Sequence, residues 1–273
     1  MSKILLKINN DCELKYPANG YILGVDKYSF LFGKTFSVSK IKEIKESIKD
    51  KKIFACLNRI IFNNELDDYK NTLNELDKLG LDGIIVGDVA ALTYDLKTDI
   101  VLDQAHLNNS YLTINHYYNN NAKGIYLTND ITKEEIKKIR SNTKSTLFKE
   151  VFLYPCLSIS RRKLISNYKE YFNLDDKSDI YEINESKSND YYKIVEDDNG
   201  AYILGSKVLN LLKYDLDVDY EIISSYLIGD VKEVLDIFIN KDVSKNDYLN
   251  KKYNCDEGFI NKKTIYKVKK DEK

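Results

Sequence analysis

KIFACLNRIIFNNELDDYKNTLNELDKLGLDGIIVGD, residues 52–88, predicts a strand, a helix and a second strand in close succession. The apolar run Ile53–Leu57 is typical of a strand that is buried on both faces. Glu65–Leu79 carries apolar side chains at helical spacing, and Gly80 follows as an expected helix stop. Gly83–Gly87 predicts the second strand, so this stretch indicates a parallel pair of strands joined by a helix.

The same alternation continues on both sides of this unit. Short apolar runs predict further strands at residues 3–8, 21–25, 100–103, 124–127 and 147–153. Amphipathic or capped stretches predict helices at residues 37–50, 89–96, 110–120 and 131–140. Such repetition predicts an α/β fold with a (β/α) TIM-barrel-like parallel sheet. No GxGxxG motif follows any of these strands, which disfavours a dinucleotide-binding sheet.

The sequence becomes more polar and less periodic after residue 172, which predicts two parts. Residues 1–172 form the expected barrel-like domain, and residues 173–273 a small C-terminal α+β extension packed on the barrel. Asn199 and Gly200 predict the tight turn of a hairpin within this extension. Its other expected elements are a polar loop at 173–189, a helix at 206–214, a strand at 220–227, a helix at 231–239, a charged loop at 241–257 and a closing strand at 259–268.

The composition is ordinary for a globular protein. The chain has 273 residues, with 42 Lys and Arg against 43 Asp and Glu. This near-neutral balance argues against a protein coated with nucleic acid, but it does not exclude local basic patches. No apolar run reaches the length of a membrane helix and no secretory signal begins the chain. We therefore expect a cytoplasmic protein with no membrane partner.

The four cysteines, Cys12, Cys56, Cys156 and Cys255, are far apart in the sequence. Because no CxxC pair occurs, they are typical of buried thiols in a reducing compartment, and no metal site is expected. The alternative is that the fold gathers them into a metal or iron–sulfur site.

A barrel of this type places its functional side chains at the carboxyl ends of the strands. Asp88, His106 and Glu150 stand at or just past such ends, which makes them candidates for acid–base or metal-assisted hydrolysis. His116 falls inside an expected helix and is more typical of a surface histidine. The sequence contains no HExxH, Walker A or GxSxG motif.

Candidate binding residues are densest between Glu150 and Tyr168. Here a strand runs into Pro155, and a pair of arginines opens the following helix. Arginines near free helix N–H groups suit a phosphate or carboxylate, whereas the plain alternative is a solvated pair with an acidic neighbour. The expected anion-binding residues are Tyr154, Arg161, Arg162 and Asn167. The expected contacts to nucleic-acid phosphates are Lys262, Lys263, Lys267 and Lys269.

The same segment resembles the signature region of the collagenase-like peptidases, peptidase family U32. The matching residues are Glu150, Phe152 and Leu164-Ile165-Ser166. Cys156 lies slightly out of register with the first signature cysteine, and Lys163 stands in place of the second. Three other stretches resemble family units in the same order, namely Asp82–Asp88, Lys123–Ile136 and Gly258–Lys269.

The run from Ser160 to Leu164, followed by Asn167-Tyr168, resembles a short, cysteine-poor branch of this family. That branch is similar to the accessory subunit of a tRNA uridine hydroxylation system, whose other chain carries the cysteines. The resemblance therefore implies a heterodimer with a cysteine-bearing homologue, with tRNA as a further partner. It implies no cofactor in this chain and an iron–sulfur cluster in the partner chain. Two alternatives are a stand-alone collagenase-like peptidase or hydrolase and a protein that binds a small carboxylate ligand.

Overall fold

The computed structural model describes residues 2–104, 108–176, 178, 180–187 and 189–262. Within these ranges eight strands form a barrel: β1 (Lys3–Lys7), β2 (Gly20–Val25), β4 (Lys52–Leu57), β5 (Gly83–Val86), β6 (Ile100–Leu102), β7 (Ala122–Tyr126), β8 (Thr146–Leu153) and β14 (Tyr220–Ser224). They pair in parallel in the order β14, β1, β2, β4, β5, β6, β7 and β8, and β8 pairs with β14 to close the barrel. The predicted TIM-barrel-like α/β fold is therefore confirmed.

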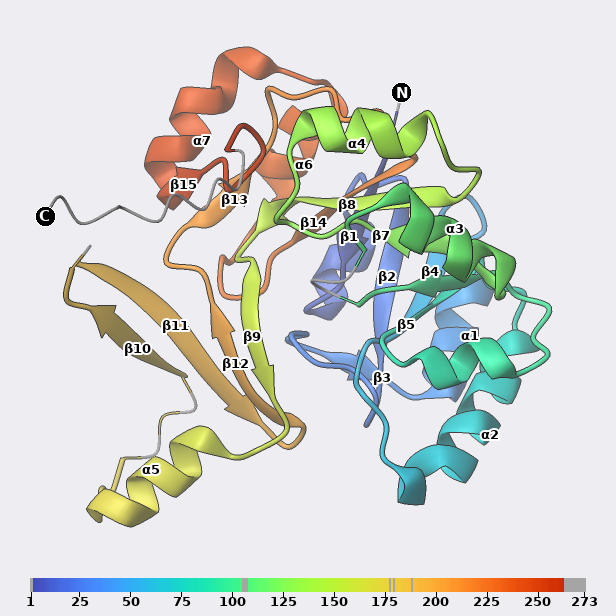
Figure 1. Cartoon of the computed structure of the whole chain (residues 1–273), viewed down its shortest axis with the longest axis horizontal. Helices are drawn as coiled ribbons and strands as arrows, with labels where there is room; N and C mark the ends of the chain where they lie inside the picture. The colour runs from blue at the N-terminus through green and yellow to red at the C-terminus, as the bar shows by residue number, and fades with distance from the viewer. Residues whose placement is uncertain (1, 105–107, 177, 179, 188, 263–273) are drawn as a thin grey trace, which may run out of the picture.

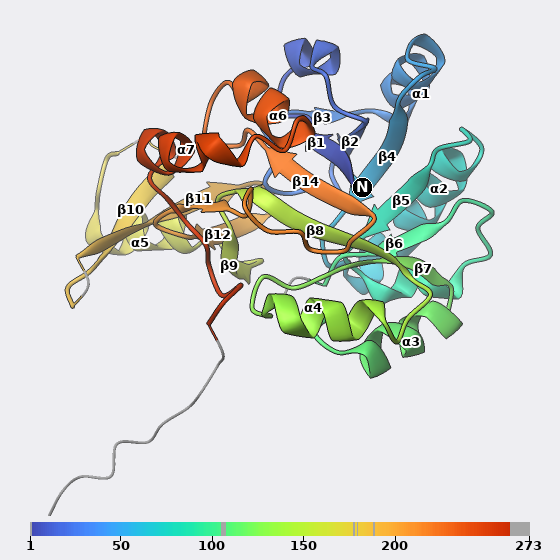
Figure 2. The same ribbon diagram turned by 90° about the horizontal axis from the view of Figure 1, so that it is seen from above.

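Helices cover the outside of this barrel (Figure 2). They are α1 (Val38–Ser47), α2 (Leu66–Asp77), α3 (Tyr111–Asn119), α4 (Lys133–Arg140) and α6 (Lys232–Ile239), with 3-10 helices η1 (Asp11–Lys15), η2 (Asn63–Glu65) and η3 (Val89–Thr93). Their starts follow from the local sequence. Ser37 Oγ accepts a hydrogen bond from the Lys40 N–H at 3.2 Å, and Thr132 forms a capping box with Glu135.

Side chains fill the inside of the barrel, which is a packed core and not a pore. This interior cluster consists of Leu5, Ile22, Phe54, Cys56, Ile85, Val101, Tyr126, Phe148 and Ile222. The ring of Phe148 contacts those of Phe54, Tyr126 and Tyr220, so it ties three strands together at the centre. The outward-facing side chains of the strands pack against the helices in a second, larger cluster.

A long insertion separates β8 from β14. It contains β9 (Cys156–Ser160), α5 (Leu164–Phe172), β10 (Ile180–Glu185), β11 (Asp190–Asp197) and β12 (Gly200–Leu204). The strands form an antiparallel sheet in the order β10, β11, β12, β9. Figure 1 shows this sheet and α5 projecting from one side of the barrel. Because the insertion follows the carboxyl end of β8, it begins at the end of the barrel where such folds carry their sites.

The chain then returns to the barrel. It forms β13 (Val208–Asn210), β14, α6, η4 (Val243–Lys245), α7 (Asn246–Tyr253) and β15 (Cys255–Asp256). Earlier in the chain, β3 (Thr35–Phe36) pairs in parallel with the end of β2. β14 supplies the last strand of the barrel, so the barrel uses residues on both sides of the boundary expected at residue 172. No helix in the described ranges has the length and apolar character needed to cross a membrane.

Three local predictions for the C-terminal part are wrong. The helix expected at 206–214 is instead the short strand β13, because pairing with β8 and β15 outweighs the local helical pattern. The charged loop expected at 241–257 contains α7, which buries a narrow stripe around Leu249 behind its polar surface. The loop expected at 173–189 contains β10, which lies at the edge of its sheet and is exposed on both faces.

Other elements lie where the sequence places them. The hairpin around Asn199 and Gly200 is formed by β11 and β12, and the strand and helix expected at 220–227 and 231–239 are β14 and α6. The short helix expected at 89–96 is the 3-10 helix η3. The closing strand expected at 259–268 lies mostly outside the described residues.

Candidate functional site

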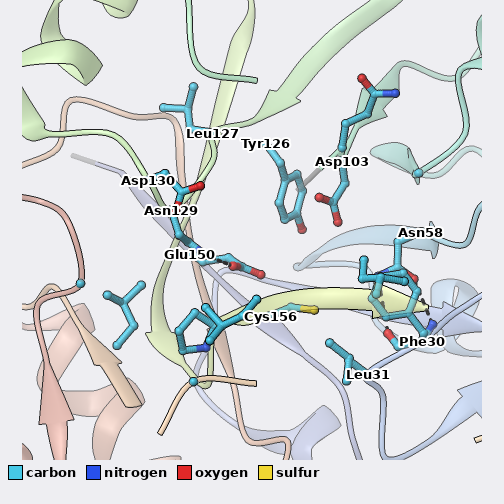
Figure 3. Close-up of a pocket in the computed structure, with 18 of the residues that line it drawn as sticks. Phe30, Leu31, Asn58, Asp103, Tyr126, Leu127, Asn129, Asp130, Glu150 and Cys156 are labelled. Carbon is cyan, nitrogen blue, oxygen red and sulfur yellow. Dashed lines mark hydrogen bonds between the residues drawn. The ribbon is translucent and has the colours of Figure 1, made fainter. Parts of the chain in front are cut away.

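A cavity of about 570 Å³ lies at the carboxyl ends of the barrel strands, within the part of the chain that the structure describes. The strand ends supply polar side chains to its lining, namely Lys7, Asn58, Asp88, Asp103, Tyr126 and Glu150. The insertion lines the other side with Cys156, Leu157, Ile159, Asp190 and Tyr192. Figure 3 shows Asp103, Tyr126 and Glu150 pointing into the same space. A cavity of this size suits a small organic molecule.

Lys7 brings a positive charge to this cavity from the end of β1. Its Nζ lies 4.5 Å from the centroid of the Phe32 ring, and no described carboxylate lies within salt-bridge distance of it. Sequence reasoning missed Lys7, because a lysine at the end of a strand looks like a surface residue. One signal was available: Lys7 lies two residues after Leu5, which faces the barrel interior, so both share that side of the strand.

Tyr126 ends β7 and lines the cavity, although only 6% of the residue is exposed. Its ring stacks on that of Phe148 at a centroid distance of 5.5 Å. No described group lies within hydrogen-bond distance of its hydroxyl. Burial raises the pKa of Tyr126, so the hydroxyl keeps its proton. The hydroxyl is not among the buried atoms that lack a partner, so it is accessible from the cavity and can contact a bound molecule.

Glu150 is held by a buried chain of polar side chains. Asn129 Nδ2 donates to Glu150 Oε2 at 2.7 Å, and Lys149 Nζ donates to Asn129 Oδ1. Because an ammonium can only donate, the oxygen of Asn129 must face Lys149 and its nitrogen must face Glu150. Lys149 is 1% exposed, and this burial lowers its pKa to about 8 against the opposing charges of Glu150 and Asp130. These two hydrogen bonds fix Oε2 of Glu150, whereas Oε1 can contact a molecule in the cavity.

Replacing Lys149 by methionine should stabilise the protein near neutral pH, by an amount that shrinks as the pH rises toward 10.5. The pKa of Lys149 is lower in the folded than in the unfolded chain. The unfolded state therefore binds more protons in the window between about 8 and 10.5, and the stability of the wild type rises with pH there. Urea titrations of both proteins at about pH 7, 8.5 and 10 measure the difference. A difference that does not change with pH would contradict this assignment.

The two cysteines beside the cavity, Cys56 and Cys156, are protonated thiols. Burial raises the pKa of each to about 12. Lys7, Asp103 and Glu150 line the same cavity, and their charges act on both thiols. Because the thiolate is both the nucleophile and the metal ligand, the raised pKa values disfavour either role. Among the described residues, no group of three or more His, Cys, Asp or Glu is arranged to hold a metal ion.

In the native protein, Cys12 should be the thiol that reacts rapidly with a disulfide reagent. It is exposed, whereas Cys56 is buried and burial also raises the pKa of Cys255 to about 12. A titration with 5,5′-dithiobis(2-nitrobenzoate) at about pH 8 should show one rapid thiol, with the remaining thiols released on unfolding. The variant Cys12→Ser should lose the rapid phase. A rapid phase that persists in this variant would show that Cys156 is more reactive than its burial predicts.

The cavity brings together two of the candidate catalytic residues. Glu150 and Asp88 both line the cavity. The Asp88 carboxylate accepts hydrogen bonds from the N–H groups of Ile61 and Ala90, both at 2.9 Å, and it caps η3, so it joins two loops. His106 lies outside the described residues. His116 is exposed on α3 and does not line the cavity.

None of the four expected anion-binding residues lines the cavity. Arg161 donates to the Ile60 carbonyl at 2.7 Å and lies 3.7 Å from Glu65 Oε2, with its guanidinium over the Phe62 ring. Arg162 and Asn167 are exposed, and Tyr154 is half-buried beneath Lys193. Lys262 is exposed near the end of the described chain, while Lys263, Lys267 and Lys269 lie outside the described residues.

A buried arginine ties the insertion to the barrel. Arg59, in the loop after β4, pairs with Glu65 and donates through Nη1 to Asn199 Oδ1 at 3.1 Å. Asn199 Nδ2 in turn donates to the carbonyl of Ser29 at 3.1 Å. Since Arg161 also approaches Glu65, the insertion is joined to one barrel loop by two arginines around a single carboxylate. This network holds the insertion over the cavity.

The fold places this chain among the TIM-barrel-like (β/α) proteins. Its eight-stranded barrel is closed, has a cavity at the carboxyl ends of the strands and carries an inserted sheet after β8. The model of peptidase family U32 matches residues 12–216, so the chain belongs to this family, as the sequence resemblance predicts.

Three relatives agree with this membership. A protein of Bacillus subtilis named tRNA hydroxylation protein P2 is 24% identical over 91% of this chain and 93% of its own length. An uncharacterized protease of Methanocaldococcus jannaschii is 28% identical over 76% of this chain, and the match spans 52% of that protein. The solved structure of a U32 peptidase has a TM-score of 0.51 at 14% identity, covering 82% of this chain and 92% of that one, which shows a shared fold.

Proposed function

We propose that this chain acts in tRNA hydroxylation, in the cytoplasm, as the accessory subunit of a two-chain enzyme of peptidase family U32. The observation that carries the proposal is the similarity to tRNA hydroxylation protein P2, which extends over 91% of this chain and 93% of that protein. A match over nearly the full length of both chains supports a shared role better than a match to one part. The partner in this proposal is a cysteine-bearing homologue from the same family.

The arrangement of the cysteines supports assigning the iron–sulfur cluster to the partner chain. Cys56 lies in the barrel interior and Cys12 is exposed, and no group of three or more His, Cys, Asp or Glu among the described residues is arranged to hold a metal ion. In the proposed enzyme the partner chain holds the cluster, and this chain contributes the cavity and contacts to tRNA. Lys262, with Lys263, Lys267 and Lys269 beyond it, supplies phosphate contacts that weaken as salt is raised.

Deleting the gene should abolish or strongly reduce hydroxyuridine in the host's tRNA, measured by mass spectrometry of digested nucleosides. Re-expression of this chain should restore the modification. Capture of the tagged chain at moderate salt should recover a cysteine-bearing family member in near-equal amount. Full hydroxyuridine content in the deletion strain would refute the proposal. In that case, cleavage of gelatin by the purified chain would identify the stand-alone peptidase instead.

A further inference from the structure

We propose that the cavity of the barrel binds a free amino acid with an apolar side chain. In this assignment the carboxylate of the ligand contacts Lys7, and its ammonium group contacts Glu150 and the hydroxyl oxygen of Tyr126. The apolar side chain lies against the surrounding carbon-rich walls. Binding can be measured on the isolated chain, so the result does not depend on whether the protein acts in tRNA hydroxylation.

The charges around the cavity favour a ligand that carries both signs. Lys7 on β1 and Glu150 on β8 both line this cavity, and Asp103 lines it as well. A plain anion would meet these carboxylates, and a plain cation would leave the ammonium of Lys7 without a counter-charge. A zwitterion satisfies both groups, because its carboxylate can face Lys7 on β1 while its ammonium faces Glu150 on β8, two strands along the barrel.

Tyr126 adds a polar group to the same side of the cavity. The residue is 6% exposed and lines the cavity, and no hydrogen bond joins its hydroxyl to another described residue. Figure 3 shows the hydroxyl directed into the space that Glu150 also faces. The carboxylates whose charges act on this phenol are Asp103 and Glu150. A phenol oxygen can accept a hydrogen bond from an ammonium group, so this side of the cavity suits the ammonium end of the ligand.

Glu150 is oriented for the other end of the ligand. Its Oε2 accepts from Asn129, whereas Oε1 has no hydrogen-bond partner among the described residues. The buried ammonium of Lys149 holds Asn129 in the orientation that keeps this arrangement. The free oxygen can therefore accept a hydrogen bond from an ammonium group, and such a charge-assisted bond is among the stronger ones in proteins.

The rest of the lining suits an apolar side chain. It includes Phe30, Leu31, Leu157, Ile159 and Phe259. Leu157, Ile159 and Phe259 are exposed by 42%, 37% and 45%, so covering them with a ligand would remove apolar surface from water. Among the described residues the lining contains more acids than lysines, and a ligand with only negative charge would lie close to those acids. The acids are Asp88, Asp103, Asp130, Glu150, Asp190 and Asp256, and the lysines are Lys7 and Lys207.

Calorimetric titration of the full chain tests the inference, with L-phenylalanine, L-tyrosine, L-leucine and L-isoleucine as the ligands. At least one of them should bind. For the amino acid that binds, the N-acetyl derivative lacks the ammonium group and the amide derivative lacks the carboxylate. Each derivative should bind at least about tenfold more weakly than the free amino acid, because each leaves one charged group of the cavity unpaired.

Three variants test the assigned contacts. Lys7→Met and Glu150→Gln should each weaken binding at least about tenfold, and Tyr126→Phe should weaken it by a smaller factor. Lys3→Met is the matched control, because Lys3 begins the same strand but lies at the opposite end of the barrel, and it should bind like the wild type. Circular dichroism and urea titration verify that each variant is folded.

The inference is overturned if none of the four amino acids binds to the folded wild type. It is also overturned if the N-acetyl derivative binds as tightly as the free amino acid, which would indicate a simple anion site. Equal affinities of the wild type and Lys7→Met would likewise contradict it, because they would place the ligand away from the assigned contacts.

Discussion

Replacing Phe148 by alanine should lower the free energy of unfolding by about 3–5 kcal/mol. Phe148 is 1% exposed at the centre of the barrel. Its ring lies 5.6 Å from that of Phe54, 5.5 Å from Tyr126 and 4.7 Å from Tyr220, measured between centroids. Alanine would remove these contacts on three strands at once, and the closed barrel has little freedom to collapse into the space left behind.

Phe172→Ala is the matched control for this experiment. The side chain removed is the same, but Phe172 is 53% exposed on α5 and contacts Tyr168 and Tyr171. Its loss should change the free energy of unfolding by no more than about 0.5 kcal/mol. Urea titration at one temperature gives both values. Similar values for the two variants would mean that the barrel interior is not the main source of stability.

The strands of the barrel could be predicted because each is buried on both faces. Runs such as Ile53–Leu57 and Gly83–Gly87 are apolar at every position, and this pattern is visible without any knowledge of neighbours. The place of Tyr220–Ser224 in the barrel could not be predicted in the same way. Its apolar residues indicate a strand, but its pairing with β1 and β8 joins segments far apart in the chain. A local sequence pattern does not indicate which distant strands will pair.

The cavity was predicted in part. Asp88 and Glu150 were found because they follow strands directly, and the barrel geometry brings both to the cavity. Lys7 and Tyr126 were missed for opposite reasons. Lys7 looks like a surface lysine that ends a strand, and Tyr126 looks like one more apolar residue inside a strand. The spacing of Lys7 from Leu5 indicates an inward side chain only once Leu5 is known to face the interior, and no local pattern marks Tyr126 as a cavity residue.

The arginines show a further limit of sequence reasoning. Arg161 sits next to a helix start, which suggests an anion site, but its position beside Glu65 is set by the way the insertion folds back on the barrel. The arginine pair is separated by this contact, since Arg161 is engaged with the barrel while Arg162 is exposed. The contact of Arg161 with Glu65, which is distant in the sequence, therefore determines the role of this arginine.

Replacing Arg59 by methionine should lower the free energy of unfolding by about 3 kcal/mol. Its side chain is 7% exposed and that of Glu65 is 16% exposed, so the variant leaves a mostly buried carboxylate with one of its two arginines. The value lies at the low end for a broken buried ion pair because Arg161 stays close. The variant also loses the hydrogen bond to Asn199, which holds the turn of the insertion to the barrel.

The response to acid separates loss of this ion pair from loss of packing. Burial alone would raise the pKa of Glu65, but the Phe62 N–H and the charges of Arg59 and Arg161 hold it below its usual value of 4.5. A carboxyl whose pKa is lowered by folding stabilises the protein above its unfolded pKa, and this stability is lost as the pH falls through the folded value. The wild type should therefore lose stability below about pH 4.5, and Glu65→Gln should lose less over the same range.

The matched control for Arg59→Met is Lys27→Met, which breaks the exposed pair between Lys27 and Asp68. Because solvent screens that pair, its loss should leave the free energy of unfolding nearly unchanged. Urea titrations at about pH 7 and pH 4 measure all three variants beside the wild type. If Arg59→Met behaved like Lys27→Met at both pH values, the insertion would have to be held by its apolar contacts, with Phe30 stacked on Tyr202 at 4.8 Å as the main one, and not by the arginines around Glu65.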